Sequence, residues 1–146
     1  WLPLRPAKGE RMVIEVPDLP ETYMWKRTVY LIPLGGQQFY VGSTNAWQWA
    51  HDRASDTGYE ELTKKLDKAL KLPYTIVSHE GAIRPNAKDR RPFLGTHQQH
   101  QLLHVFNGFG TKGVSQTPLL AKLMINYLVK DEPLWEEVKI SRYAKK

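Results

Sequence analysis

A glycine-rich turn is the stretch of this sequence whose spacing most directly suggests chemistry. An apolar run over Leu102–Phe106 leads into Gly108–Gly113, and an amphipathic segment follows. A strand, turn and helix in this order present free backbone N–H groups at a helix N-terminus, where a phosphate or a flat anionic ring binds. The spacing also matches G-x-G-x-x-G, but Asp131, the acidic residue at the expected distance, follows a helix and not a second strand. We therefore expect a backbone cradle for part of a cofactor in preference to a complete dinucleotide site or a simple turn.

Two polar side chains on predicted strands have the chemistry to bind a carboxylate. Arg84 ends an apolar strand, and an arginine at a sheet edge can hold a carboxylate through two parallel N–H bonds. From the residues alone, an ordinary salt bridge to Asp89 is the simpler explanation. Tyr30 lies in the middle of a strand, where a tyrosine is usually a core residue with a local hydroxyl partner. The residue types alone therefore do not decide whether Arg84 and Tyr30 have a structural role or a binding role.

Three histidines have the residue type that suits a metal, namely His97, His100 and His104. Their spacing matches neither a helix-borne zinc pair nor any ligand set that the rest of the sequence completes. The sequence also offers no Ser-His-Asp order and no activated nucleophile. We therefore expect no metal site and no catalytic side chain in this chain.

The composition is that of a basic globular protein. The chain has 146 residues, with 21 Lys and Arg against 15 Asp and Glu, and 41% of its residues are hydrophobic. Its length is that of one ordinary domain with a buried core. The basic residues are interleaved with acidic ones, whereas a nucleic-acid surface gathers its charge on one face, so we do not expect nucleic acid as the partner. The excess positive charge also fits an acidic partner segment that lies outside this sequence.

The sequence contains no cysteine, no signal-peptide pattern and no apolar run long enough to cross a membrane. These features fit a cytoplasmic protein, since the cytoplasm keeps thiols reduced. The sequence begins Trp-Leu-Pro-Leu-Arg-Pro without an initiator methionine. We therefore expect it to be a piece of a longer protein.

Hydrophobic alternation predicts an antiparallel sheet and one helix in the N-terminal part. The runs typical of strands are Arg11–Val16, Arg27–Leu34, Gln38–Gly42 and Tyr74–Ile83. Gly35-Gly36 supplies a hairpin turn, and Pro33 predicts an edge or a bulge. Asp56–Leu70 is predicted as a helix because its apolar residues recur every three or four positions, and Thr57 with Glu60 fits a capping box.

The C-terminal part is predicted as one strand and one helix. Leu102–Phe106 has no strand neighbour in the predicted order, so it resembles an element of a parallel sheet whose other strands lie elsewhere. The helix is expected from Thr117, the residue before Pro118, to Lys130, with its buried face formed by Leu120, Leu123, Met124, Tyr127 and Leu128. The expected fold class is α+β. It divides into a sheet-and-helix substrate domain over residues 1–101, a returning strand, turn and helix over residues 102–130, and a tail over residues 131–146.

Taken together, these stretches resemble the C-terminal portion of the D-amino-acid oxidase, glycine oxidase and sarcosine oxidase family of FAD enzymes. The matching pieces follow the family's order and cover nearly the whole chain: Pro6–Glu10, Tyr30–Pro33, Tyr40–Thr44, Gly81–Pro85, Asp89, Pro92–Gly95 and Gly108–Val114. The resemblance implies an antiparallel substrate-binding sheet over the flavin ring and a final strand and helix that return to the FAD domain. The family's N-terminal G-x-G-x-x-G segment, which binds the ADP part of FAD, has no counterpart here. We therefore expect this chain to need that segment as a partner and to bind FAD weakly or not at all alone.

The resemblance also implies roles for individual residues. Arg84 and Tyr30 would bind the substrate carboxylate, and Thr111 stands where some members place a further substrate-contacting residue. The turn would contact the flavin through Gly108, Phe109, Gly110, Thr111, Lys112, Gly113, Val114 and Ser115. The dipole of the following helix favours negative charge on the reduced ring.

These roles imply oxidation of the C–N bond of a small amino or N-methyl amino acid by hydride transfer to flavin in the complete protein. Two alternatives stay open. Gly113–Leu123 resembles the flavin domain that removes a carboxymethyl group from a tRNA uridine, and the chain could also be a binding module without catalysis. A basic concave face would favour the tRNA-modifying enzyme. An Arg84–Asp89 pair with no cavity nearby would favour the binding module.

Overall fold

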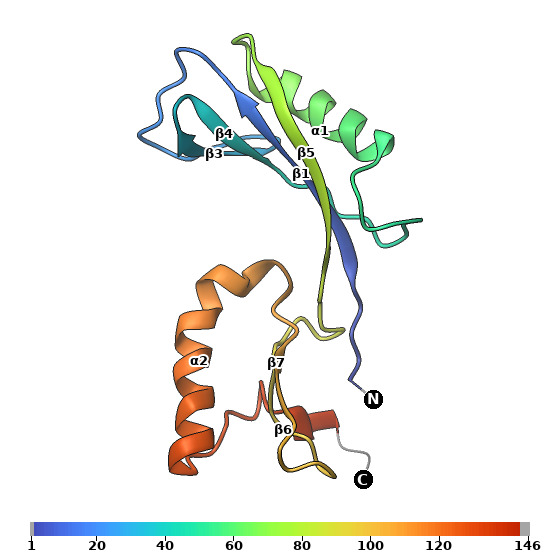
Figure 1. The fold of residues 1–146 in the computed structure, drawn as a ribbon, viewed down its shortest axis with the longest axis vertical. Helices are drawn as coiled ribbons and strands as arrows, with labels where there is room; N and C mark the ends of the chain where they lie inside the picture. Colours follow the sequence, from blue (N-terminus) through green and yellow to red (C-terminus); the bar gives the residue numbers. More distant parts are fainter. Residues whose placement is uncertain (1, 144–146) are drawn as a thin grey trace. The chain divides into compact units, whose positions relative to one another are not determined.

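The computed structural model describes residues 2–143, which form two compact units (Figure 1). The sheet unit is Ala7–Ile83. The hairpin-helix unit comprises the residues up to Pro6 and those from Arg84 onward. The sheet unit is thus inserted in the chain of the other unit, and each unit has a hydrophobic core of its own.

The sheet unit contains a five-stranded sheet in the order β2-β3-β4-β1-β5. Its strands are β1 (Ala7–Glu15), β2 (Trp25–Lys26), β3 (Tyr30–Gly35), β4 (Gln38–Gly42) and β5 (Thr75–Arg84). The pairs β1–β4, β3–β4 and β2–β3 are antiparallel, which confirms the predicted antiparallel sheet and its β3–β4 hairpin. The register of β3 and β4 shifts between Pro33 and Gly35, which confirms the predicted irregularity at the proline. The two-residue strand β2 was not predicted, because so short a segment shows no alternation.

Helix α1 (Asp56–Ala69) packs on one face of this sheet, and the opposite face is called the outer face below. Its apolar stripe buries Leu62 and Leu66 in a core that also contains Met12, Ile14, Val16, Val29, Leu31, Phe39 and Val41. The predicted helix is therefore confirmed, but its predicted cap is wrong. Ser55 is the N-cap, and its side chain accepts a hydrogen bond from the Gly58 N–H.

Strand β1 begins at Ala7, four residues before its predicted start at Arg11, and these additional residues include a buried ion pair. Lys8 and Glu10 are each 3% exposed, and Nζ of Lys8 lies 2.7 Å from Oε1 of Glu10. Ser55 donates to the same carboxylate from its N–H at 3.0 Å and its hydroxyl at 2.6 Å, and Nε2 of His79 lies 2.9 Å from it. Burial by itself raises the pKa of Glu10, but the bonds from Lys8 and Ser55 outweigh it and lower this pKa to about 2. The cluster ties the start of α1 to two strands.

The hairpin-helix unit contains an antiparallel pair of strands and the second long helix. These are β6 (Phe93–Thr96), β7 (His104–Asn107) and α2 (Gly113–Lys130), with short 3-10 helices at Gly110–Lys112 and Ile140–Tyr143. Leu94 of β6 lies opposite Phe106 of β7. The expectation of an unpaired strand is therefore wrong. The sequence predicted a loop where the structure has strand β6. Phe93, Leu94 and Gly95 are all buried, so the strand shows no alternation of apolar and polar residues that could have identified it.

Helix α2 begins at Gly113, four residues before the predicted start at Thr117. Pro118 lies inside the helix, where it has no N–H to donate to the carbonyl of Val114, and Figure 1 shows a bend near the beginning of α2. The predicted buried face is confirmed for Leu120, Leu123, Met124 and Tyr127, whereas Leu128 is 44% exposed. Within residues 2–143, no helix has the length and apolar character needed to span a bilayer.

Candidate functional site

The turn between β7 and α2 requires glycine at two positions. Gly108 has φ of 82° and Gly110 has φ of 55°, a left-handed conformation that other residues rarely adopt. A Cβ on Gly108 would lie 2.7 Å from Cδ2 of Phe93, and a Cβ on Gly110 would lie 2.3 Å from Oδ1 of Asn86. Asn86 also forms an isolated bridge with Phe109. The path of the turn is therefore fixed by β6 and by the segment that follows β5.

The first turn of α2 leaves backbone donors available. Lys112 is the N-cap and makes no side-chain hydrogen bond to the helix, and the first turn contains no acidic residue. The N–H groups at the start of an α-helix, here including those of Val114 and Ser115, have no acceptor within the helix. They lie at the positive end of the helix dipole, and Lys112 adds a further positive charge. This end of α2 suits a negatively charged or electron-rich flat group.

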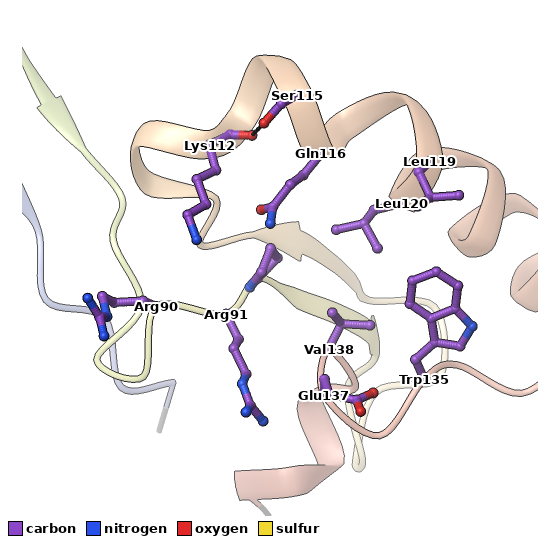
Figure 2. A pocket seen from close by; sticks show the side chains of 11 residues that line it. Arg90, Arg91, Lys112, Ser115, Gln116, Leu119, Leu120, Trp135, Glu137 and Val138 are labelled. Carbon is purple, nitrogen blue, oxygen red and sulfur yellow. Dashed lines mark hydrogen bonds between the residues drawn. The ribbon is translucent and has the colours of Figure 1, made fainter.

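A pocket of about 310 Å³ lies beside this turn, within the hairpin-helix unit (Figure 2). Its walls come from the segment before β6, the first turns of α2 and the C-terminal tail. The lining residues are Arg90, Arg91, Pro92, Lys112, Ser115, Gln116, Leu119, Leu120, Trp135, Glu137 and Val138. The structure thus places two of the predicted cofactor-contacting residues, Lys112 and Ser115, on the wall of a cavity.

The pocket combines an apolar side with a positively charged side. Figure 2 shows Leu119, Leu120 and Trp135 together on one side, away from Arg90. Oε1 of Gln116 is buried and has no hydrogen-bond partner among residues 2–143. The positive charge comes from Lys112 and the two arginines, and Glu137 is the acidic residue in the lining.

Most of the residues that line this pocket were not predicted from the sequence. Arg90 and Arg91 precede β6, a strand that was itself not predicted, and their adjacency was the one signal available. Trp135 and Val138 come from the tail, and no periodicity in the sequence relates a tail to the helix before it.

Tyr30 lies on β3 with its side chain on the outer face of the sheet. It is 41% exposed, whereas its neighbour Leu31 is 3% exposed and lies in the core. Nζ of Lys26 lies 5.3 Å from the centroid of the Tyr30 ring. Tyr30 is therefore not the core residue that a strand tyrosine usually is, and its ring is accessible.

Arg84 is the last residue of β5, and burial lowers the pKa of its guanidinium. Asp89, the partner that the sequence offered for Arg84, forms a salt bridge with Arg142, with Nε and Oδ2 3.2 Å apart. It also accepts a hydrogen bond of 3.0 Å from the Arg91 N–H. Burial raises the pKa of Asp89, but its hydrogen bonds, including those from Arg91 and Arg142, lower this pKa below its ordinary value. Asp89 thus stays ionised and holds the C-terminal tail.

The histidines of the β6–β7 hairpin make local contacts. Nδ1 of His104 lies 2.9 Å from the Thr96 hydroxyl, which also accepts a hydrogen bond of 3.0 Å from Tyr127. The rings of His97 and His100 lie 4.8 Å apart between centroids. In the part of the chain that the structure describes, no group of three or more His, Cys, Asp or Glu side chains could hold a metal ion.

The class of this protein, a cofactor-dependent oxidoreductase, follows from comparison with a family of known proteins. The chain belongs to the family described as DAO, FAD dependent oxidoreductase, whose model matches residues 1–127. FAD is therefore the cofactor that the family implies.

Comparison with individual proteins agrees with this assignment. The chain is 28% identical over 142 residues to glycine oxidase from Geobacillus kaustophilus, which covers 92% of this chain and 37% of the relative. It is 24% identical over 132 residues to the bifunctional protein MnmC of tRNA 5-methylaminomethyl-2-thiouridine biosynthesis from Idiomarina loihiensis, covering 84% of this chain and 21% of that protein. The chain thus spans little more than a third of the length of the glycine oxidase.

Solved structures share the fold. The crystal structure of Geobacillus kaustophilus glycine oxidase superimposes with a TM-score of 0.76 at 24% identity, over 92% of this chain and 37% of that one. Iminodiacetate oxidase from Chelativorans sp. BNC1 gives a TM-score of 0.74 at 23% identity, over 98% of this chain and 40% of that one.

Proposed function

We propose that this chain is the substrate-binding and flavin-covering portion of an enzyme that oxidises the C–N bond of a small amino or N-methyl amino acid. The observation that carries this proposal is the family match over residues 1–127. FAD, when bound, supplies the acceptor for the hydride that leaves the substrate α-carbon. The protein's contribution is binding and orientation, since we assign no side chain of this chain as an acid or base.

Tyr30 and Arg84 would hold the substrate carboxylate. The hydroxyl of Tyr30 is a hydrogen-bond donor on the accessible outer face, and a guanidinium can bind a carboxylate through two parallel bonds. Holding the carboxylate fixes the orientation of the α-carbon next to it, which is a positioning role. Thr111, exposed in the turn before α2, is a further candidate for contact with the substrate.

The turn residues from Gly108 to Ser115 would contact the flavin. The available N–H groups at the start of α2 and the charge of Lys112 fit the electron-rich end of a flavin ring. The pocket beside them, with its basic and apolar sides, fits a flat anionic group as well. These features hold only one end of so large a cofactor, which is consistent with a site shared with other sequence.

The partner we propose is an FAD-binding segment, such as the family places before this portion. Helix α2 is apolar on more than its buried side: Val114 is 96% exposed, Ile125 59% and Val129 75%. Exposed apolar side chains that recur along one helix are often covered by a partner. We propose that residues 102–130 pack with that segment, while residues 1–101 form the substrate domain and residues 131–146 a tail.

The test is a steady-state assay of the protein that carries this chain, with sarcosine and glycine as substrates and an artificial dye as electron acceptor. We expect Arg84→Ala to raise KM about tenfold to a hundredfold, the value of hydrogen bonds between charged groups. Arg27→Ala, which removes an exposed arginine of the sheet unit, is the matched control and should leave KM unchanged. An unchanged KM in Arg84→Ala, or no oxidation of either amine, contradicts the proposal.

A second candidate is a flavin domain that acts on a modified tRNA uridine, which the similarity to MnmC favours. Competition distinguishes the two, because tRNA should inhibit dye reduction only in the tRNA-modifying enzyme. The non-catalytic module is less well supported, since Asp89 pairs with Arg142 and a pocket lies beside the predicted flavin-contacting turn.

A further inference from the structure

A row of residues crosses four strands on the outer face of the sheet. Lys26 of β2 lies opposite Tyr30 of β3, Tyr30 lies opposite Gly42 of β4, and Gly42 lies opposite Arg11 of β1. Directly opposed residues of antiparallel strands share a face of the sheet. The sequence neighbours of the row point to the opposite face. Met12 follows Arg11, Leu31 follows Tyr30 and Val41 precedes Gly42, and all three are buried in the core under α1.

Arg11 is held in a defined orientation at one end of this row. Its Nε and Nη2 atoms donate to the same oxygen of Glu80, Oε2, at 3.0 and 2.7 Å. Its Cζ lies 4.4 Å from the centroid of the Tyr40 ring. A guanidinium has five N–H donors, so a single carboxylate oxygen leaves several of them available. Its side chain is 50% exposed, which makes those donors accessible.

Gly42 leaves an open floor between Tyr30 and Arg11. Neighbouring strands lie about 4.8 Å apart, so the backbones of β3 and β1 are separated by about 10 Å at this row. A Cβ built on Gly42 would have Arg11 Cβ, at 3.8 Å, as its nearest neighbour. Gly42 itself carries no side chain into this space, so a small anion such as a carboxylate can approach the backbone between Tyr30 and Arg11.

The charges around this floor favour an anion. Arg11 and Lys26 are positive and Glu80 is negative, so the row and its ion-pair partner carry a net positive charge. Glu80 competes with a bound anion for Arg11, but it also keeps the guanidinium fixed on the Tyr40 ring. A preoriented arginine loses less conformational freedom when it binds a carboxylate.

We propose that Arg11 binds a second carboxylate of the substrate, above Gly42, and so selects amines that carry two carboxylates. Tyr30, on the other side of Gly42, would hold the carboxylate next to the reacting carbon. The assignment of this ligand as a substrate rests on the proposed function, whereas the carboxylate site itself rests on the row. An amine with one carboxylate would use Tyr30 and leave Arg11 with Glu80 alone.

The test compares iminodiacetate with sarcosine, two secondary amines that differ by one carboxylate. Each is titrated into the ¹⁵N-labelled 146-residue chain while the Gly42 amide and the Arg11 Nε–H resonances are followed. We expect iminodiacetate to shift both resonances and to bind about tenfold more tightly than sarcosine, the value of one charge-assisted hydrogen bond.

Variants locate the effect at the row. Arg11→Met and Gly42→Ala should each reduce iminodiacetate binding to the level of sarcosine, and Gly42→Ala does so without removing a charge. Glu80→Gln should tighten iminodiacetate binding. Lys64→Met, which removes an exposed positive charge from α1, is the control and should change nothing.

Equal affinity for the two ligands, or a preference that survives both Arg11→Met and Gly42→Ala, overturns the inference. Failure of the proposed function gives a different result from failure of the carboxylate site. In that case the protein that carries this chain oxidises neither sarcosine nor glycine, while the preference of the chain for iminodiacetate persists.

Discussion

At the scale of single residues, Glu10 is a buried charged residue of the sheet unit whose contacts affect stability. Its carboxylate is buried and is satisfied by Lys8 and Ser55, with His79 close by. A buried pair is costly to break, because the remaining partner keeps its charge without compensation. Glu10 therefore organises the polar end of a core that is otherwise apolar.

We predict that Glu10→Gln lowers the free energy of unfolding at neutral pH by about 3 kcal/mol, since it leaves Lys8 buried without its counter-charge. The pKa of Glu10 falls from 4.5 to about 2 on folding, so its ionisation stabilises the native state above pH 4.5 and ceases to do so as the pH falls toward 2. Urea unfolding of the wild type and Glu10→Gln across this pH range measures both effects. The two proteins should converge toward pH 2, and a constant difference would contradict the assignment.

At the scale of elements, Gly58 illustrates how packing overrides propensity. It lies in the first turn of α1, where alanine would ordinarily favour the helix by about 1 kcal/mol. A Cβ at this position would lie 2.0 Å from Oε2 of Glu10. The carboxylate is fixed by its partners and cannot move aside cheaply.

We therefore predict that Gly58→Ala destabilises the protein by about 1–3 kcal/mol, the usual cost of overpacking. Gly113→Ala is the matched control, because it also lies at a helix start and its Cβ would have ordinary contact, 3.7 Å, with Cβ of Phe109. Thermal unfolding should show a lower Tm for Gly58→Ala and no loss for Gly113→Ala. Equal effects would mean that Glu10 does not constrain this turn.

Most of the helices and strands could be predicted from the sequence. Alternation and three-four periodicity identified the long strands and both helices, because each has one face in a core. The cap at Ser55 was missed because Thr57, two residues further on, fits a capping box with Glu60, although serine is itself a typical N-cap residue. The start of α2 was misplaced because Thr117-Pro118 resembles a helix start more closely than a glycine turn does.

Only part of the candidate site could be predicted from the sequence. The cradle from Gly108 to Ser115 and the residues Tyr30 and Arg84 were proposed from local sequence and family resemblance. The pocket wall at Trp135 and the row through Arg11 depend on tertiary contacts and on strand register. Neither leaves a periodic signal in the sequence.

At the scale of the whole molecule, the chain should bind FAD weakly. It spans 37% of the length of the glycine oxidase it matches, and its predicted flavin contacts are confined to one turn and one helix end. We predict no saturation in a flavin-fluorescence titration at micromolar chain and FAD. A yellow protein that retains stoichiometric FAD through purification would show that these residues suffice.

The insertion of the sheet unit has a consequence for protein engineering. The chain enters this unit on β1 and leaves it on β5, which are adjacent in the sheet, and Leu4 bridges Ala87 just outside the two crossing points. Residues 7–83 can therefore be grafted as a cassette between homologous proteins with only two junctions, both close together. Chimeras made in this way would exchange Tyr30 and the row through Arg11 while leaving Arg84, the glycine turn and its helix unchanged.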